Sequence, residues 1–198
     1  VDKHIQQAQK RAGKLKHLFA AHLGEAKKLE FEDHFADLVI LHGPLYHLPD
    51  KDDRIQALME AKRVLKPKGI LLGFAINYTA STMVGLVQGV ITHNDFYDMC
   101  LTELQSGNHQ APENMPGVLP KAYYHRPEEL KAEIEESGFV HRETLPVEGL
   151  IWLDRNYFET RGDEVKRERM MELLQIIEKD PGLLVFSPHL LAVGQKLT

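Results

Sequence analysis

Two apolar runs joined by one helical pattern constrain the fold of this chain more than any other feature. Residues 37–41 (DLVIL) and 69–76 (GILLGFAI) are almost wholly apolar, which is typical of strands buried on both faces of a parallel sheet. Between them, residues 50–66 place apolar side chains at helical spacing, with an aspartate to cap the start and Pro67 to end the helix. This order of strand, helix and strand predicts a right-handed crossover between parallel strands.

The rest of the chain continues the alternation of helical and strand-like patterns, which predicts an α/β fold. The further predicted elements are helices at residues 1–13, 127–138 and 164–180 and strands at residues 15–23, 139–150 and 183–193. Pro188 lies inside the last of these strands and cannot donate a ladder hydrogen bond, so we expect that strand near an edge of the sheet or with a bulge. The 198 residues give room for a single domain, residues 1–198, with a proper core.

Residues 78–124 interrupt this alternation. They open with small and apolar side chains and continue into a stretch rich in glycine and proline. We interpret them as an insertion that is mostly helical at first and irregular afterwards. An insertion of this kind is typical of a lid or of a wall over a binding pocket.

Composition argues against several classes of protein. The chain has 24 Lys and Arg residues against 29 Asp and Glu, which gives a net charge of -5. A generic role in binding nucleic acid or an anionic membrane surface is disfavoured, because such binding needs a cationic surface. No apolar run approaches the roughly 20 residues that span a bilayer. The single cysteine, Cys100, allows no intrachain disulfide and suits the reducing cytoplasm, where we expect the protein to act.

Three segments carry a resemblance to a known family. Gly24-Glu25-Ala26 follows a predicted strand, residues 37–48 (DLVILHGPLYHL) combine a buried strand with its exit loop, and residues 60–69 read EAKRVLKPKG. In their order and spacing these segments resemble the class I S-adenosylmethionine-dependent methyltransferases, in their small-molecule branch, and the resemblance extends over nearly the whole chain. It implies a Rossmann-like, doubly wound sheet with an antiparallel last strand, S-adenosylmethionine as the cofactor, and methyl transfer to a small-molecule acceptor.

The sequence departs from the family pattern in two places. Lys68 occupies the first glycine of the expected Gly-Gly turn, which is a mild change if this residue has an ordinary φ. The glycine-rich loop after the family's first strand and the acidic residue that ends its second strand are both missing from the sequence. We therefore expect the first two strands to be absent from this chain through N-terminal truncation. The alternative is a rearranged chain that borrows strands from a neighbour, which leaves a homodimer open.

The resemblance implies a cofactor site at the carboxyl ends of the strands. Glu25 would accept a hydrogen bond from the adenine amino group, and the amide of Ala26 would donate to the adjacent ring nitrogen. Gly43 would let the backbone approach the methionine part of the cofactor, with His42 and Leu45 beside it. The alternative for Glu25 is a solvated carboxylate on a surface turn.

Aromatic and histidine side chains are the candidates for binding the acceptor. Tyr46 and His47 follow the bend at Gly43, and His47 could accept a proton from the acceptor as a general base. The other candidates lie in or beside the insertion: Tyr78, His93 and Tyr124. Each of these side chains could instead pack against its neighbours. Methyl transfer from a sulfonium needs little beyond in-line positioning and desolvation, so the hypothesis does not depend on a base.

The 11 histidines form no recognisable metal motif, because the sequence has no cysteine pair and no His-Glu-x-x-His segment. We therefore predict no metal ligands. Two other functions stay open. One is a non-catalytic methyltransferase-like module for ligand binding or oligomerisation. The other is a nicotinamide-dependent oxidoreductase on a related sheet, for which Glu25 fits poorly.

Overall fold

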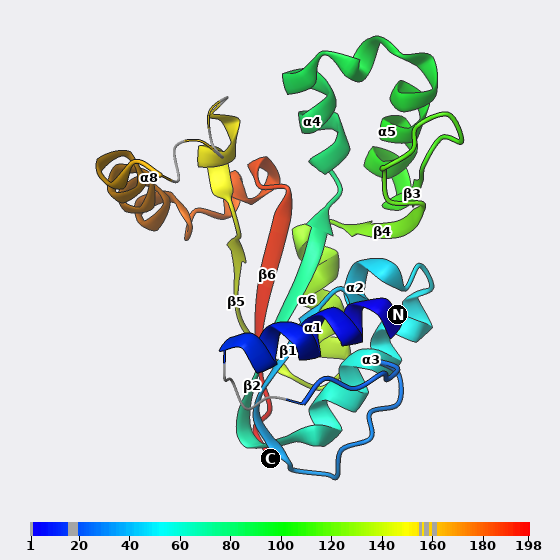
Figure 1. Ribbon diagram of the computed structural model, residues 1–198, viewed down its shortest axis with the longest axis vertical. Coiled ribbons are helices and arrows are strands. Elements are labelled where there is room, and N and C mark those ends of the chain that lie inside the picture. Colours follow the sequence, from blue (N-terminus) through cyan, green and yellow to red (C-terminus); the bar gives the residue numbers. More distant parts are fainter. Residues whose placement is uncertain (1, 16–19, 155, 157–158, 160–161) are drawn as a thin grey trace.

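The computed structural model describes residues 2–15, 20–154, 156, 159 and 162–198 of the chain. Within these residues, six strands form one mixed sheet flanked by helices (Figure 1). The elements follow the chain in the order α1 (Asp2–Leu15), β1 (Ala36–His42), α2 (Pro44–His47), α3 (Lys51–Val64), β2 (Leu65–Asn77), α4 (Ala80–Gln88), η1 (Val90–Thr92), α5 (Asn94–Ser106), β3 (Asn108–Gln110), β4 (Lys121–His125), α6 (Pro127–Glu136), β5 (Val140–Pro146), η2 (Gly149–Leu153), α8 (Glu164–Ile177), η3 (Pro181–Phe186) and β6 (His189–Gln195).

The long strand β2 pairs with three other strands and so holds the sheet together. Along most of its length it lies between β1, which is parallel to it, and β6, which is antiparallel. Its last two residues, Ile76 and Asn77, pair in parallel with β4, and β5 extends the other side by pairing antiparallel with β6. The β1–α3–β2 unit has the predicted order and parallel pairing, and the last strand is antiparallel, as the resemblance implies.

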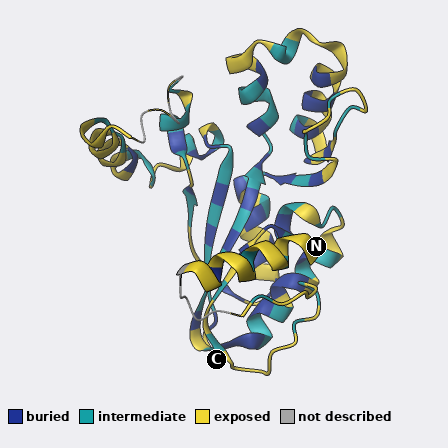
Figure 2. Cartoon of the chain, in the orientation of Figure 1, coloured by how far each residue is buried: buried dark blue, intermediate teal, exposed yellow. Residues whose placement is uncertain are grey.

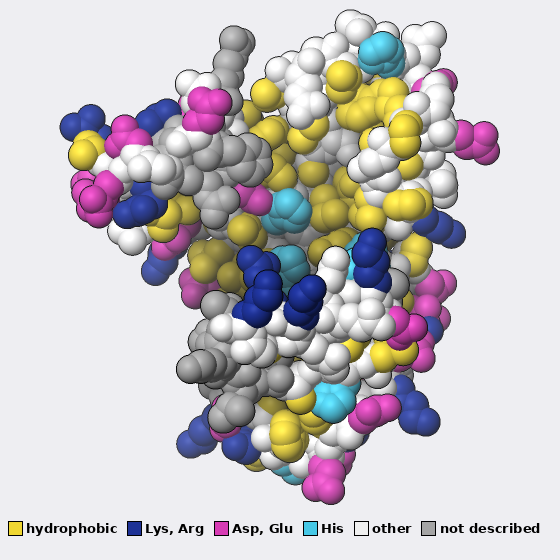
Figure 3. All heavy atoms as spheres, in the orientation of Figure 1, with side chains coloured by type: hydrophobic (Ala, Val, Ile, Leu, Met, Phe, Trp, Pro, Cys, Tyr) yellow, Lys and Arg dark blue, Asp and Glu magenta, His cyan; other side chains and the backbone are white. Residues whose placement is uncertain are grey.

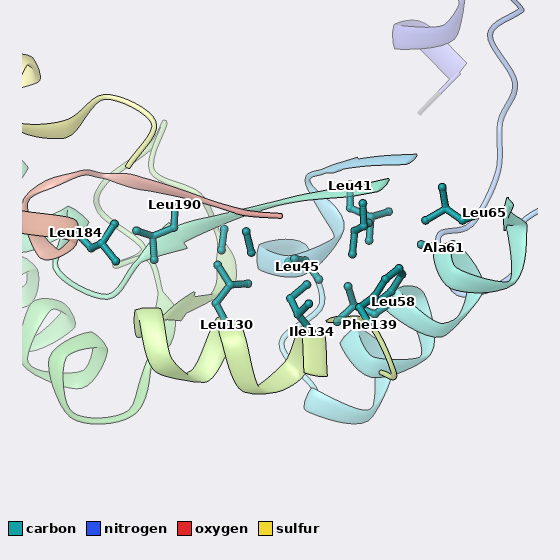
Figure 4. Packing of buried hydrophobic residues seen from close by; sticks show 13 residues of the cluster. Leu41, Leu45, Leu58, Ala61, Leu65, Leu130, Ile134, Phe139, Leu184 and Leu190 are labelled. Atoms are coloured by element: carbon teal, nitrogen blue, oxygen red, sulfur yellow. The ribbon is translucent and has the colours of Figure 1, made fainter. Parts of the chain in front are cut away.

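One face of the sheet is covered by α3 and α6, and the main hydrophobic core lies between them and the strands. Figure 2 shows buried residues along the middle strands and these two helices. Figure 4 shows Leu130 and Ile134 of α6 pointing at the sheet, where Leu41 of β1 and Leu190 of β6 meet them. Burying an aliphatic side chain of this size contributes about 1.5–3 kcal/mol, so this layer is a major source of stability.

The opposite face of the sheet, here called the open face, is half-exposed. Side chains alternate along each strand, so a set of apolar residues from β1, β2 and β6 points away from α3 and α6. Its members are Leu38, Ile40, Ile70, Leu72, Phe74, Ile76, Leu191 and Val193. Leu38 is 48% exposed and Ile40 is 55% exposed. The prediction of strands buried on both faces is therefore wrong, because little of the described chain covers this side of the sheet.

The predicted strand at residues 15–23 does not form in the part of it that the structure describes. Residue 15 ends α1 and residues 20–23 have no regular secondary structure, while residues 16–19 lie outside the described residues. A strand without a neighbour leaves its backbone groups unpaired, and residues 20–23 pair with none of the strands that the structure describes. The chain that follows is held against α3 instead, where Arg63 donates hydrogen bonds to the carbonyls of Leu29 and Phe31.

The last strand is shorter than predicted. Residues 181–186 form the 3-10 helix η3, capped by Asp180, and β6 begins only after Pro188. β6 lies between β2 and the edge strand β5, so it is near an edge of the sheet, as predicted. Pro188 lies just before the ladder and removes none of its hydrogen bonds. The irregularity of this ladder lies between His141 and Glu143 of β5.

Residues 78–124 fold as helices α4, η1 and α5, then the short strand β3 and an irregular stretch that leads into β4. Two small apolar clusters lie inside this insertion, one around Phe96 and Met99 and the other around Ala122. The sequence predicted neither β3 nor β4, which pair with each other in a hairpin ladder. It also did not predict the one-turn helix α2 or the 3-10 helix η2. Other differences lie at element ends: α3 stops at Val64, β5 at Pro146 and α8 at Ile177.

Lys68 has a backbone conformation that glycine adopts more easily. Its φ is 67°, and it lies in the turn where the resemblance leads us to expect glycine. The departure is therefore not mild, because a Cβ in the left-handed region costs roughly 1 kcal/mol. Two hydrogen bonds hold this backbone: Lys68 N donates to Lys196 O, and Gln195 Nε2 donates to Lys68 O.

We predict that Lys68→Gly stabilises the protein by roughly 0.5–1 kcal/mol, because it removes the strain at positive φ and leaves both backbone hydrogen bonds in place. The measurement is urea-induced unfolding followed by circular dichroism. Lys66→Gly is the control, since Lys66 lies in the same strand with a negative φ and should lose stability on the same change. A Lys68→Gly variant that is as unstable as Lys66→Gly would contradict the assignment of strain.

Candidate functional site

The carboxyl ends of the parallel strands meet at one edge of the sheet. β1 ends at His42, β2 at Asn77 and β4 at His125. β5 runs parallel to β2, because each is antiparallel to β6, so β5 also ends here and β6 begins here at His189. Open α/β sheets bind ligands at this edge, and several of the predicted site residues lie there.

The bend after β1 is built around Gly43. Its φ is 136°, a value that residues with side chains rarely adopt, and the residue is buried. A Cβ added at Gly43 would lie 3.6 Å from Cδ2 of His47 and 3.9 Å from the hydroxyl of Tyr46. Pro44 then opens the one-turn helix α2. The bend therefore places bare backbone, with no side chain, at the carboxyl end of β1.

The residues around this bend have different surroundings. His42 lies on the open face, with its ring centroid 4.8 Å from that of Phe74. The rings of Tyr46 and His47 lie 4.7 Å apart; His47 is exposed, and burial raises the pKa of the Tyr46 hydroxyl. Leu45 is fully buried in the main core, so its side chain packs there and only its backbone is placed for a ligand.

Glu25 and Ala26 lie in a tight turn beside the start of α3. The neighbouring Lys27 places its Nζ 2.9 Å from Oδ1 of Asp53, in the first turn of α3. Because α3 follows α2 closely, this turn and the bend at Gly43 are held at the same end of the crossover unit. The Glu25 side chain is 70% exposed, with Lys27 Nζ at 3.8 Å. An exposed carboxylate at this place can accept a hydrogen bond from an amino group such as that of adenine, so it fits the role that the resemblance implies.

Two of the three candidates in or beside the insertion come together, because Tyr78 packs against the small apolar cluster that contains Tyr124. Tyr78 follows β2 directly, and the guanidinium of Arg126 lies 4.2 Å from its ring centroid. Tyr124 is buried and stacks on His109 at 4.6 Å inside the insertion, where burial raises the pKa of its hydroxyl. His93 is exposed in the connection between α4 and α5, at the end of the insertion that is remote from the sheet (Figure 1). Tyr78 and Tyr124 both lie at the edge, since Tyr124 of β4 pairs with Ile76 of β2, whereas His93 does not.

A buried ion pair fixes α6 against α3 beneath this edge. A terminal nitrogen of Arg54 lies 2.7 Å from Oε1 of Glu133, and both side chains are almost wholly buried. His125 Nε2 lies 3.2 Å from the other carboxylate oxygen. Burial by itself raises the pKa of the Glu133 carboxyl, but hydrogen bonds from His125 and Arg54 outweigh it and hold the pKa at about 2. The pair therefore ties α3, α6 and the end of β4 together.

A second carboxylate–histidine pair lies at the edge itself, and the sequence analysis missed it. Glu148 follows the end of β5, and its Oε1 lies 2.6 Å from Nδ1 of His189 at the start of β6. The two residues are 41 positions apart, so their spacing gives no signal. Their positions relative to the strands do give a signal. Glu148 comes just after one strand and His189 begins its antiparallel neighbour, so the two side chains face each other across the ladder.

Figure 3 shows a hollow over the open face of the sheet, next to this edge. The insertion borders it on one side, η2 and α8 border it on the other, and α1 crosses its lower end (Figures 1 and 3). Hydrophobic side chains line most of the hollow, and histidines lie among them. An apolar wall with a few polar groups is typical of a site for a small molecule.

Other kinds of chemistry find little support in the described part of the chain. Among the described residues, no group of three or more histidine, cysteine, aspartate or glutamate side chains is placed to hold a metal ion. Cys100 is buried, which raises the pKa of its thiol to about 11 and makes it a poor nucleophile. None of the helices that the structure describes is long and apolar enough to cross a membrane.

Comparison with known proteins agrees with this geometry. The family model described as a methyltransferase domain matches residues 1–73, a range that contains both Glu25 and Gly43. An S-adenosylmethionine-dependent methyltransferase from Methanosarcina mazei superimposes with a TM-score of 0.60 at 18% identity, over 100% of this chain and 79% of that one. The chain has the class I methyltransferase fold. The predicted fold class is therefore confirmed, and the family model supports the resemblance over residues 1–73.

Two further solved structures are similar at lower identity. A protein from Pyrococcus horikoshii OT3 matches with a TM-score of 0.53 and 15% identity, over 99% of this chain and 68% of that one. A candidate sarcosine dimethylglycine methyltransferase from Galdieria sulphuraria matches with a TM-score of 0.53 and 13% identity, over 99% of this chain and 67% of that one. A comparison with curated proteins finds no match. At these identities the solved structures establish the fold and leave the acceptor open.

The Glu133 pair predicts how stability depends on acid. The pKa of Glu133 is about 2 in the folded protein against an ordinary value of 4.5, so the unfolded state binds more protons between these limits. The stability that the pair contributes is present above about pH 4.5 and is lost as pH falls toward 2. We expect a loss of roughly 3 kcal/mol from this group, measured by urea unfolding at a series of pH values.

Glu133→Gln should be less stable at neutral pH, because it leaves Arg54 buried without a charged partner, and it should lose the acid dependence due to this group. Glu136→Gln is the matched control, since Glu136 lies on the same helix in an exposed ion pair with Lys51 at 2.7 Å. This control should keep the acid dependence of the parent chain. An unchanged acid dependence in Glu133→Gln would show that the pair does not contribute in this way.

Proposed function

We propose that this chain transfers a methyl group from S-adenosylmethionine to a small-molecule acceptor. The observation that carries the proposal is the bend at Gly43, which places backbone with a φ of 136° at the carboxyl end of β1. The bend lies inside the segment that matches the methyltransferase-domain model. Bare backbone at this position in an α/β sheet allows the close approach of a bound ligand.

Bound S-adenosylmethionine supplies an electrophilic methyl group on a positively charged sulfur. Glu25 and Ala26 would hold the adenine edge, and the backbone from His42 to Leu45 would run along the methionine part. The exposed carboxylate of Glu25 and the net charge of -5 suit a cationic cofactor better than an anionic one. In this proposal Leu45 acts through its backbone, because its side chain belongs to the core.

The acceptor would lie in the hollow over the open face, beside the end of β2. The predicted acceptor residues nearest to this edge in the fold are Tyr46, His47, Tyr78 and Tyr124. The apolar lining favours a small and largely apolar molecule, and it would remove water from the reacting atoms (Figure 3). Holding the acceptor in line with the methyl group can supply much of the rate enhancement without covalent chemistry by the protein.

The free edge of β1 favours a second candidate, a non-catalytic module that binds a ligand or oligomerises. Among the described residues, β1 pairs with β2 alone, and Leu38 and Ile40 are exposed beside the free edge. Unpaired strand edges with apolar side chains associate readily with other strands. The two functions differ in a measurable property, because the methyltransferase requires a cofactor at Gly43 and an oligomerisation module does not.

We expect S-adenosylmethionine and its demethylated product to bind with micromolar affinity, measured by isothermal titration calorimetry. The measurement uses residues 1–198 and the full reading frame that contains them. Gly43→Ala should weaken binding about tenfold or more, because a Cβ at this φ forces the bend to move. Gly117→Ala is the matched control: Gly117 also has a positive φ, 98°, but it lies in the insertion with open space around it.

Absence of binding by both polypeptides would contradict the methyltransferase proposal. Equal affinities of Gly43→Ala and the parent chain for S-adenosylmethionine would show that the cofactor does not bind at the bend. If the module interpretation holds instead, sedimentation should show an oligomer of residues 1–198 that Ile40→Lys dissociates, with no cofactor binding in either state.

A further inference from the structure

The pair formed by Glu148 and His189 has the geometry of a base held in place by an acid. We infer that His189 accepts a proton from the methyl acceptor and that Glu148 is its positioning residue, so that the acceptor carries a hydroxyl or amino group on a largely apolar frame. This inference rests on the proposed methyl transfer and goes beyond it, because it names the base and the class of acceptor. None of the predicted site residues has this arrangement.

Glu148 fixes which nitrogen of His189 carries the hydrogen. Its Oε1 lies 2.6 Å from Nδ1, and its Oε2 accepts a hydrogen bond from the backbone N of His189 at 3.1 Å. Burial alone raises the pKa of the Glu148 carboxyl, but hydrogen bonds from His189 and Ser187 outweigh it, and the pKa is lowered. An ionised carboxylate can only accept, so Nδ1 is the donor. The neutral imidazole therefore presents the lone pair of Nε2.

The carboxylate is itself held by a buried serine. The hydroxyl of Ser187, which has no exposed surface, accepts hydrogen bonds from the backbone N of Glu148 at 3.2 Å and of Gly149 at 3.1 Å. The carbonyl of Ser187 accepts a further bond from Asn77 Nδ2 at 2.9 Å, at the end of β2. Glu148 is therefore fixed to the edge of the sheet, as a positioning group needs to be.

The imidazole faces the place where an acceptor would lie. His189 pairs with Ile76 in the ladder, and both residues lie on the open face, one step along from Phe74 and Leu191. Its side chain is 46% exposed, and its Nε2 has no hydrogen-bond partner among the described residues. His42 lies on the same face, beside Phe74. A free nitrogen above an apolar floor is placed to reach a polar atom on a largely apolar ligand.

His47, the base that the sequence suggested, lacks these features. It is exposed on α2, and within the described residues its ring contacts Tyr46 and no carboxylate. Nothing there orients its nitrogens or selects a tautomer. A general base works best when a second group fixes its ring, which is the arrangement at His189.

The proton and the electrons balance in this step. The bond between the acceptor atom and its hydrogen breaks, and the proton goes to Nε2 of His189. The electron pair left on the acceptor atom forms the bond to the methyl carbon. The sulfur–carbon bond breaks with its electron pair on sulfur, which becomes a neutral thioether. His189 afterwards releases the proton to solvent through its exposed side.

The first test needs no turnover. At a pH where the His189 ring is neutral, nitrogen-15 NMR of the histidine rings should show its hydrogen on Nδ1, and Glu148→Gln should abolish this preference. S-adenosylhomocysteine together with phenol should then shift the ring signals of His189. A neutral His189 with hydrogen on Nε2, or signals that do not respond to the two ligands, would overturn the inference.

The second test measures methyl transfer from labelled S-adenosylmethionine to phenol and to benzylamine. His189→Asn keeps a donor for Glu148 but cannot take a proton, so kcat should fall by roughly 100-fold or more with a nearly unchanged KM. Glu148→Gln should also lower kcat, but by a smaller factor than His189→Asn. His141→Asn is the control, because His141 lies on β5 and binds Thr144 at 2.8 Å, away from this edge.

The outcomes separate this inference from the proposed function. If S-adenosylhomocysteine does not bind, the proposed function fails and the base role fails with it. If it binds but neither phenol nor benzylamine is methylated, the acceptor class is wrong. If both are methylated and His189→Asn retains the activity of His141→Asn, methyl transfer stands and the base role is overturned.

Discussion

The pairing of β2 with its three neighbours is the constraint on which the rest of the structure depends. A slip of one residue in any of these ladders would exchange the two faces of a strand, so the register is held by the core residues on one side. With Ala75 buried against α6, Phe74 and Ile76 must lie on the open face. The same register then sets His42 beside Phe74 and His189 beside Ile76. Backbone hydrogen bonds between the strands thus place residues that are far apart in sequence on the same face of the sheet, at the same edge.

Polar side chains then tie the loops to that edge. Asn77 ends β2 and donates to the carbonyls of Leu184 and Ser187, which fixes η3, and the Ser187 hydroxyl in turn holds the backbone after β5. On the other side, the Arg54–Glu133 pair holds α6 to α3. Removing charges from water is costly, and such a pair stabilises a fold only when its partners are fully bonded. Here the guanidinium also donates to the carbonyls that precede α3, so its hydrogen bonds join α3, α6 and the chain between α2 and α3.

The parts of this arrangement that local sequence patterns encode could be predicted from the sequence. The runs at residues 37–41 and 69–76 gave the parallel pair, and the glycine after the first run gave the bend at Gly43. The prediction failed where a local pattern needs a distant partner. Residues 15–23 have strand-like composition, but the described residues 20–23 pair with no described strand. Half-exposure of the open face depends on what covers the sheet, which composition does not encode. The contact between Glu148 and His189 exists only once β5 and β6 are paired, so it becomes visible in the fold and not along the chain.

Three carboxylate–histidine pairs in the described chain show why exposure, rather than the pair itself, decides function. His109 is buried with Glu103 at 2.6 Å, and its other nitrogen is bonded to the carbonyl of Leu119. Since that carbonyl can only accept, both ring nitrogens are occupied, and the pair can only hold the insertion together. His125 is wholly buried against Glu133, so no ligand reaches its second nitrogen. In His189 the same chemistry leaves one nitrogen bonded to an acid and the other open to an apolar hollow. A proton can therefore enter and leave a binding site through His189. His109 and His125 are buried and cannot exchange a proton in this way.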